Sequence, residues 1–194
     1  MRIEPPDPPL TDGLVLLRPW TQEDVPAIVE ACNDDEEIGR WLDHVPQPYS
    51  ESDAREFVAL TRRGWSDSTT AQLAVTAAAA EAATAGSLLG SIGVTWIDVA
   101  ERVAEVGYWV RREARGRGVA TRSLRLVSRW AIAVCGTERL QLRADTENVA
   151  SRRAAERAGF RYEGIVRSAR FNVRQGRRVD FALYSLLPGE LGES

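Results

Sequence analysis

The segment VGYWVRREARGRGVATRSL, residues 106–124, constrains the fold of this chain more than any other stretch. An apolar, strand-like run ends at Val110, and an amphipathic helical pattern starts directly after Gly116 and Gly118. Glycine lets the backbone approach an anion closely, and the first N–H groups of a helix have no internal partner and lie at the positive end of its dipole. The segment therefore predicts a strand, a phosphate-binding turn and a helix. The alternatives are a turn in which glycine serves geometry alone and a disordered basic segment that binds nucleic acid.

The charge of the chain bears on the nucleic-acid alternative. The net charge is −3 and the isoelectric point is near 5.4, whereas affinity for nucleic acid comes mainly from basic side chains. All 25 basic residues are arginine, which excludes mechanisms that need a Schiff-base or P-loop lysine. The 194 residues, 44% of them hydrophobic, are enough for one domain with a sizeable core. We expect a single domain with no nucleic-acid partner.

Several other features suggest where such a protein works. The N-terminal MRIEPPDPPL lacks the apolar stretch of a signal peptide, and no run approaches the roughly 20 apolar residues of a membrane span. Cys32 and Cys135 are far apart and have no metal-like spacing. We expect a cytoplasmic protein with reduced, buried thiols, no metal and no membrane partner.

Hydrophobic periodicity and turn residues predict the order of the elements. Strands are expected over residues 14–18, 73–75, 91–97, 105–110 and 140–144, with a final hairpin of 164–173 and 178–187. Helices are expected over 21–32, 50–64, 120–134 and 149–158, a loop over 41–49 and a hairpin connection over 77–86. Without strict βαβ alternation, this order indicates an α+β fold: a mixed, mostly antiparallel sheet with helices on both faces. We expect a proline-rich lead-in over 1–12, one domain over 13–187 and a tail over 188–194.

Two motifs then carry a resemblance to a known family. The stretch EVGYWVRREARGRGVATRSL resembles the acetyl-coenzyme A motif of the Gcn5-related N-acetyltransferase superfamily, Arg/Gln-x-x-Gly-x-Gly/Ala, at Arg115, Gly118 and Ala120. The stretch ENVASRRAAERAGFRYEG resembles that family's second motif, with matches at Asn148, Ser151, Gly159, Phe160 and Gly164. The resemblance covers residues 14–187 and is greatest for the bacterial branch that acetylates ribosomal-protein N-termini, which also contains enzymes acting on other amines.

The resemblance implies an N-acetyltransferase that uses acetyl-coenzyme A and no metal, with direct attack of an amine in a ternary complex. It also implies that strands 106–110 and 140–144 splay apart, so that the pantetheine arm of the cofactor inserts between them. The Trp109–Val110 backbone is then assigned to pantetheine and the 115–120 amides to the pyrophosphate. Asn148 is a candidate ligand of the arm, a helix N-cap, or both. The implied cofactor-binding residues are Trp109, Val110, Arg115, Gly116, Arg117, Gly118, Val119, Ala120, Asn148 and Ser151.

Acyl transfer needs an oxyanion donor, a base and an acid. We assign the oxyanion donor to the backbone N–H of Val110 and the base to Glu105. Further candidates for the base are Asp98, Asp145 and His44, the only histidine, whose side chain titrates in a useful range. Many members of the superfamily carry a tyrosine acid seven residues after the motif asparagine, but this position is Ala155 here. Ser151 is the hydroxyl left for that role.

The acceptor is less well defined. Trp41, His44 and Trp65 lie where the resemblance places the acceptor pocket, although aromatic residues commonly serve the core. The two tryptophans could equally favour a bulkier donor such as succinyl-coenzyme A. An α-amine, with a pKa near 8, needs less help than a lysine-like amine near 10.4. Protein N-termini and small-molecule amines both stay open, as do a homodimer and a non-catalytic acyl-coenzyme A-binding module.

Overall fold

The computed structural model describes residues 3–78 and 86–191. Within them the strands form one sheet in the order β1-β2-β3-β4-β5-β6-β8-β7. All neighbouring strands pair antiparallel except β5 and β6, which are parallel. The strands are β1 (Leu10–Thr11), β2 (Val15–Pro19), β3 (Thr70–Ala77), β4 (Leu88–Asp98), β5 (Val103–Val110), β6 (Arg139–Asp145), β7 (Arg161–Asn172) and β8 (Arg177–Leu186).

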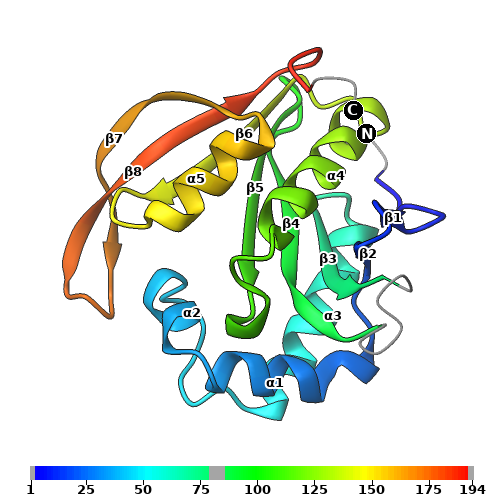
Figure 1. Ribbon diagram of the computed structural model, residues 1–194, viewed down its shortest axis with the longest axis vertical. Helices are drawn as coiled ribbons and strands as arrows, with labels where there is room; N and C mark the ends of the chain where they lie inside the picture. The colour runs from blue at the N-terminus through cyan, green and yellow to red at the C-terminus, as the bar shows by residue number, and fades with distance from the viewer. Residues whose placement is uncertain (1–2, 79–85, 192–194) are drawn as a thin grey trace.

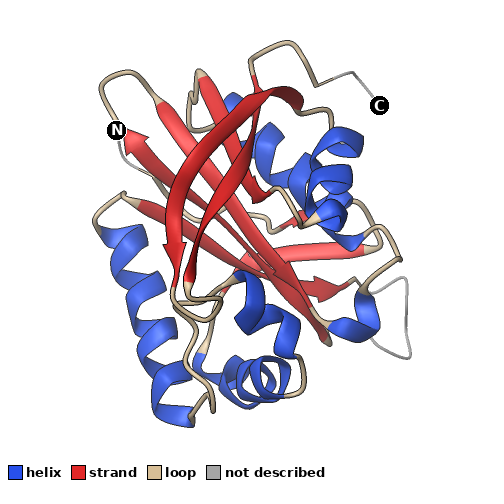
Figure 2. Cartoon of the chain, turned by 90° about the vertical axis from the view of Figure 1, so that its left-hand side faces the viewer, coloured by secondary structure: helices blue, strands red, loops and turns tan. Residues whose placement is uncertain are grey.

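Helices cover both faces of this sheet, which confirms the predicted α+β class. Helices α1 to α3 lie on one side, and α4 and α5 on the other (Figures 1 and 2). Their bounds are α1 (Val25–Asn33), α2 (Glu36–Trp41), α3 (Glu51–Ser66), α4 (Val119–Ala133) and α5 (Val149–Ala158). The predicted helix over 149–158 has these bounds and ends at Gly159, whose φ of 101° is left-handed.

Some boundaries differ from the sequence expectation. The first helix is preceded by a 3-10 turn over Gln22–Asp24, so the α-helix itself starts at Val25. Helix α2 was not predicted, and its last residue, Trp41, was assigned to a loop. Asp35 starts this helix as its N-cap, because its Oδ1 accepts from the N–H of Glu37 at 3.1 Å. The predicted connection over 77–86 falls mostly outside the described residues.

Two clusters of buried side chains hold the layers together. The larger lies between the sheet and α4, where Leu124 and Val127 are fully buried against Ile92 of β4. The smaller joins α1 and α3 to the opposite face of the sheet. Alternation along β3 explains the division, because Leu73 and Val75 belong to the larger cluster and Ala74 belongs to the smaller.

The sheet opens between β5 and β6, as predicted for residues 106–110 and 140–144. The parallel ladder contains only the pairs Val103↔Arg139, Ala104↔Leu140 and Glu105↔Gln141. Beyond them, β5 stays paired with β4 as far as Val110, and β6 stays paired with β8 as far as Asp145. Each strand therefore has one unpaired edge facing the opening.

Candidate active site

A cleft of about 790 Å³ starts at this opening. Its walls come from β5, the turn before α4, the start of α5, the end of α2 and the β7–β8 hairpin. Most of the residues singled out from the sequence line it: Trp41, His44, Glu105, Trp109, Val110, Arg115, Gly116, Gly118, Val119, Ala120, Asp145, Asn148 and Ser151.

The turn before α4 has the geometry of an anion site. Gly116 and Gly118 have φ values of +74° and +79°, a region that L side chains avoid, and Gly118 is the N-cap of α4. A Cβ at Gly116 would meet nothing within 4 Å, so the backbone conformation, and not crowding, requires glycine there. No side chain caps the helix, which leaves the first-turn N–H groups facing the cleft. These groups fit a phosphate.

The hydrogen-bond register of β5 decides which backbone groups face the opening. The N–H of Arg111 donates to the carbonyl of Leu89 at 2.9 Å. Along an antiparallel ladder, hydrogen-bonded residue pairs alternate with pairs that are not hydrogen-bonded to each other. Trp109, opposite Ser91 and two residues before Arg111, therefore also bonds to β4. Tyr108 and Val110 direct their backbone groups to the opening. The structure therefore does not support a pantetheine contact from the Trp109 backbone, since the β4 ladder uses its groups. The backbone groups of Tyr108 face the opening instead.

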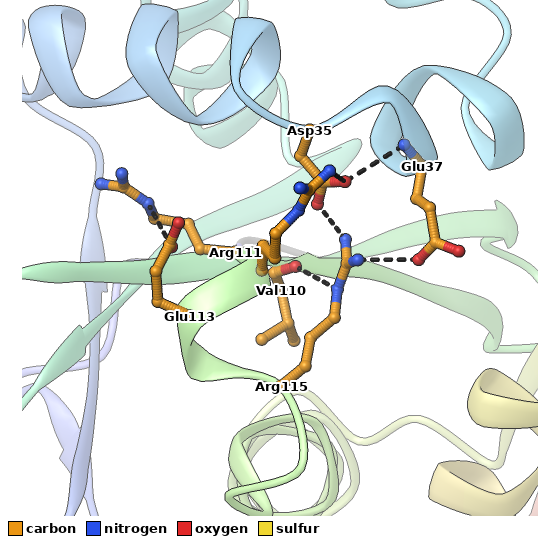
Figure 3. Close-up of polar contacts among 7 residues, drawn as sticks. Asp35, Glu37, Val110, Arg111, Glu113 and Arg115 are labelled. Carbon is orange, nitrogen blue, oxygen red and sulfur yellow. Dashed lines mark hydrogen bonds and ion pairs between the residues drawn. The ribbon is translucent and has the colours of Figure 1, made fainter.

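Arg115 is directed away from the phosphate turn (Figure 3). Its guanidinium pairs with Asp35 and with Oε2 of Glu37 at 2.7 Å, and its Nε donates to the carbonyl of Val110 at 3.1 Å. The Asp35 side chain is only 2% exposed. Arg115 therefore ties the start of α2 to the end of β5, so the sequence assignment of this residue to the cofactor holds at most for its backbone.

The other end of the cleft is formed where two distant segments meet. The tip of the β7–β8 hairpin lies against residues 40–47: Arg170 pairs with Asp43 at 2.9 Å, and the N–H of Val173 donates to Asp43 at 3.0 Å. The guanidinium carbons of Arg143 and Arg170 lie 5.8 and 5.5 Å from the centre of the Phe181 ring. We call this region, with Trp41 and His44, the acceptor end.

Glu105 lines the cleft but is not free. Nε and Nη2 of Arg143 donate to its two carboxylate oxygens at 2.6 and 3.0 Å, and Gln141 donates to Oε2 at 3.1 Å. A carboxylate offers about four lone-pair positions, so these bonds use both on Oε2 and one on Oε1. One acceptor position remains on Oε1. Of the other carboxylate candidates for the base, Asp145 lines the cleft, whereas Asp98 lies at the end of β4, outside it.

His44 and the tryptophans have different environments. Burial and the nearby Arg170 lower the pKa of His44, and the opposing effect of Asp43 is smaller than the two together. The lowered pKa favours a neutral imidazole at physiological pH. Trp41 lines the cleft, with the Arg40 guanidinium 4.7 Å from its ring centre. Trp65 does not line it. Its ring packs edge-on against Trp130, 5.9 Å between centres, in the larger core cluster, because the last turn of α3 directs it there.

Asn148 and Ser151 stand at the start of α5. Asn148 Oδ1 accepts from the N–H of Ser151 at 3.0 Å, which makes Asn148 an N-cap, the alternative role considered for it. Ser151 Oγ accepts a hydrogen bond of 3.0 Å from the hydroxyl of Tyr108. Sequence reasoning missed Tyr108, although the alternation of side chains along the GYWV strand could have placed it on the face of the sheet that α4 and α5 cover. It also missed Arg143, Arg170 and Phe181.

Neither a cluster of metal-ligating side chains nor a membrane-spanning helix is present in the described part of the chain. Over residues 3–78 and 86–191, no three histidine, cysteine, aspartate or glutamate side chains come together as metal ligands would. No helix in the same part of the chain combines the length and apolar character needed to span a bilayer.

Comparisons with known proteins agree with this geometry. An acetyltransferase (GNAT) domain model matches residues 15–161. The Bacillus subtilis (strain 168) protein named "Putative ribosomal N-acetyltransferase YdaF" is 30% identical over 176 residues, covering 90% of each chain. The structure of Mycobacterium smegmatis RimJ in complex with CoA-disulfide has a TM-score of 0.85 at 22% identity, covering 99% of this chain and 93% of that one. The apo structure of RimL, a ribosomal L7/L12 α-N-protein acetyltransferase, has a TM-score of 0.77 at 20% identity, covering 92% of each.

The family match extends over well more than half of the chain, and the YdaF alignment over nine tenths of it. The predicted enzyme class, an acetyl-coenzyme A-dependent N-acetyltransferase, is confirmed, and the open anion turn and unpaired strand edges fit that cofactor. The chain belongs to the GNAT acetyltransferase family.

Proposed function

We propose that this enzyme acetylates an α-amine, such as the N-terminus of a protein or peptide. The observation that carries the proposal is that carboxylates at the acceptor end and along the cleft beside it are paired with arginines. Glu105 is paired with Arg143, Asp43 with Arg170 and Glu37 with Arg115. A polyamine would find little uncompensated negative charge among these carboxylates, whereas a single α-amine needs less. The name of the YdaF relative, a ribosomal N-acetyltransferase, favours the same acceptor.

The cofactor roles follow from the backbone. The N–H groups of Val119 and Ala120, with those of the turn residues 115–118, would hold the pyrophosphate at the start of α4. The unpaired edge of β5 would hold the pantetheine amides. The N–H of Val110 at the end of that edge would stabilise the oxyanion, since the strand register directs it into the opening.

The proton leaves the amine by way of Glu105. Its remaining lone-pair position on Oε1 can accept a proton directly or through water, while Arg143 and Gln141 hold the carboxylate in place. His44 is the second candidate, because its lowered pKa makes it neutral at physiological pH. Ser151 would protonate the leaving thiolate.

Three wider assignments complete the proposal. The catalytic domain spans residues 13–187. The enzyme works in the cytoplasm, a setting consistent with unpaired Cys32 and Cys135, both of which have pKa values raised by burial. A homodimer is supported by the exposed apolar side chains Ile165 and Phe171 on β7. Sedimentation at several concentrations would test the dimer.

A panel of acceptors tests the function. Peptides with a free α-amine, the same peptides blocked at the N-terminus, spermidine and simple amines are each offered with acetyl- or succinyl-coenzyme A, and free thiol is followed. We expect release that depends on the free α-amine and is fastest with the acetyl donor. Faster release with spermidine, or cofactor binding without release for every amine, would contradict the proposal.

A further inference from the structure

Two hydroxyl groups meet across the opening between β5 and β6. The hydroxyl of Tyr108, from β5, donates to Ser151 Oγ, from the first turn of α5, at 3.0 Å, and lies 3.4 Å from the Ser151 carbonyl oxygen. Both side chains line the cleft. We call Tyr108 and Ser151 the hydroxyl pair.

Strand alternation separates the hydroxyl pair from Glu105. Tyr108 shares a face of β5 with Ala104 and Val106, which pack into the α4 cluster. Glu105 belongs to the opposite face, where Arg143 of β6 meets it. A group threaded through the opening would therefore have a carboxylate on one side and two hydroxyls on the other.

The serine is held so that its own hydrogen remains available. Its N–H is fixed by Asn148 Oδ1 at 3.0 Å, and its Oγ accepts from Tyr108. Among the described residues, the structure gives the Ser151 hydroxyl hydrogen no acceptor other than the Tyr108 oxygen, which already donates to Ser151, so this hydrogen can be donated to a molecule in the cleft.

The tyrosine keeps its proton over the pH range in which the reaction runs. Burial raises the pKa of Tyr108 above its ordinary value of 10, and the bond with Ser151 only partly offsets this effect. A coenzyme A-like thiol has a pKa near 8.5. Tyr108 is thus protonated whenever the departing sulfur needs a proton.

We propose that the hydroxyl pair is the proton relay to the leaving thiolate, replacing the tyrosine that is absent at Ala155. As the acyl carbon–sulfur bond breaks, its electron pair moves to sulfur. Ser151 Oγ gives its proton to that sulfur and receives the Tyr108 proton in exchange. Solvent returns a proton to Tyr108, balancing the one that the amine has lost. Ser151 is the catalytic residue and Tyr108 is the positioning residue that acts through it.

The relay rests on the proposed transfer reaction, and a double-mutant cycle tests it. Tyr108→Phe removes only the hydroxyl and keeps the ring, and Ser151→Ala removes the other member. We expect each single variant to lower kcat about tenfold, with acetyl-coenzyme A affinity unchanged. This loss is smaller than the roughly 100- to 10,000-fold typical of acid–base catalysis, because a thiol leaves readily. In the Ser151→Ala background, Tyr108→Phe should have almost no further effect on kcat. Ser151→Thr, which keeps a hydroxyl, should recover part of the loss.

The control is Tyr162→Phe, which removes the hydroxyl of a tyrosine that is 51% exposed on β7, outside the cleft. It should leave kcat as in the parent. Thermal melting of each variant confirms folding. The relay is overturned if Tyr108→Phe leaves kcat unchanged, if it changes only cofactor affinity, or if its effect is undiminished in the Ser151→Ala background. Absence of thiol release by the parent with every amine would contradict the proposed function and the relay together.

Discussion

Replacing Gly118 by alanine should weaken acetyl-coenzyme A binding through backbone strain alone. Gly118 has φ +79°, and a Cβ there would meet only Arg122 Nε, at 3.8 Å, so no clash contributes. An L residue in the left-handed region costs about 1–2 kcal/mol. If the cofactor needs this conformation, the dissociation constant rises by about 5- to 30-fold, since 1.4 kcal/mol corresponds to tenfold.

Gly189 provides the matched control. Its φ is +85°, a Cβ there would meet nothing within 4 Å, and it lies outside the cleft. Calorimetric titration with acetyl-coenzyme A and thermal melting would be measured for Gly118→Ala, Gly189→Ala and Arg117→Ala. We expect similar losses of melting temperature for the two glycine variants, but weaker binding for Gly118→Ala than for either other variant. Equal affinity in Gly118→Ala and Gly189→Ala would refute the reasoning about the turn.

Three further predictions concern the groups around the cleft. Asp35→Ala should raise the acceptor KM and lower the free energy of unfolding in urea by about 2 kcal/mol. The reason is that it leaves Arg115 without its buried partner and α2 without its N-cap. An unchanged free energy of unfolding would contradict this. Glu105→Gln should lower kcat/KM about 100-fold at neutral pH without changing cofactor affinity, and a larger loss in His44→Asn would reassign the base. Arg139 and Ser185 lower the pKa of Glu163 from 4.5 to about 2, so the stability that this carboxylate adds is present above about pH 4.5 and lost as the pH falls toward 2. The melting temperatures of the parent and of Glu163→Gln should therefore differ at pH 7 and converge near pH 2, whereas a constant difference would show that the charge is not responsible.

The sequence predicts the central layers well because their signals are local. The helix of residues 149–158 has a polar N-cap at Asn148 and a glycine stop at Gly159, and both act within one turn. The glycine turn before α4 is likewise fixed by the positive φ values of Gly116 and Gly118, which are separated by one residue. The opening between the parallel strands β5 and β6 was expected only through the family resemblance, since no local sequence pattern specifies where the pairing of two strands ends.

The acceptor end could not be predicted in the same way. It depends on Arg170 meeting residues 40–47, which are more than a hundred positions away in the chain, and on Phe181, whose ring lies under the Arg170 guanidinium. Helix α2 has only six residues, too few for an apolar period, and its start depends on Asp35, which is held by Arg115. Trp65 shows a different error: the family resemblance suggested that it lines the acceptor pocket, while the end of α3 directs its ring into the core.

The central claim, transfer of an acetyl group to an α-amine, is tested most directly on one peptide that carries both a free N-terminus and a lysine side chain. The peptide is incubated with the enzyme and acetyl-coenzyme A at neutral pH, and fragment mass spectra locate the added group. The account predicts acetylation of the N-terminal amine, with the lysine unmodified. Acetylation of the lysine in preference to the N-terminus would contradict it. So would the absence of any modification across a set of such peptides that differ in their N-terminal residue.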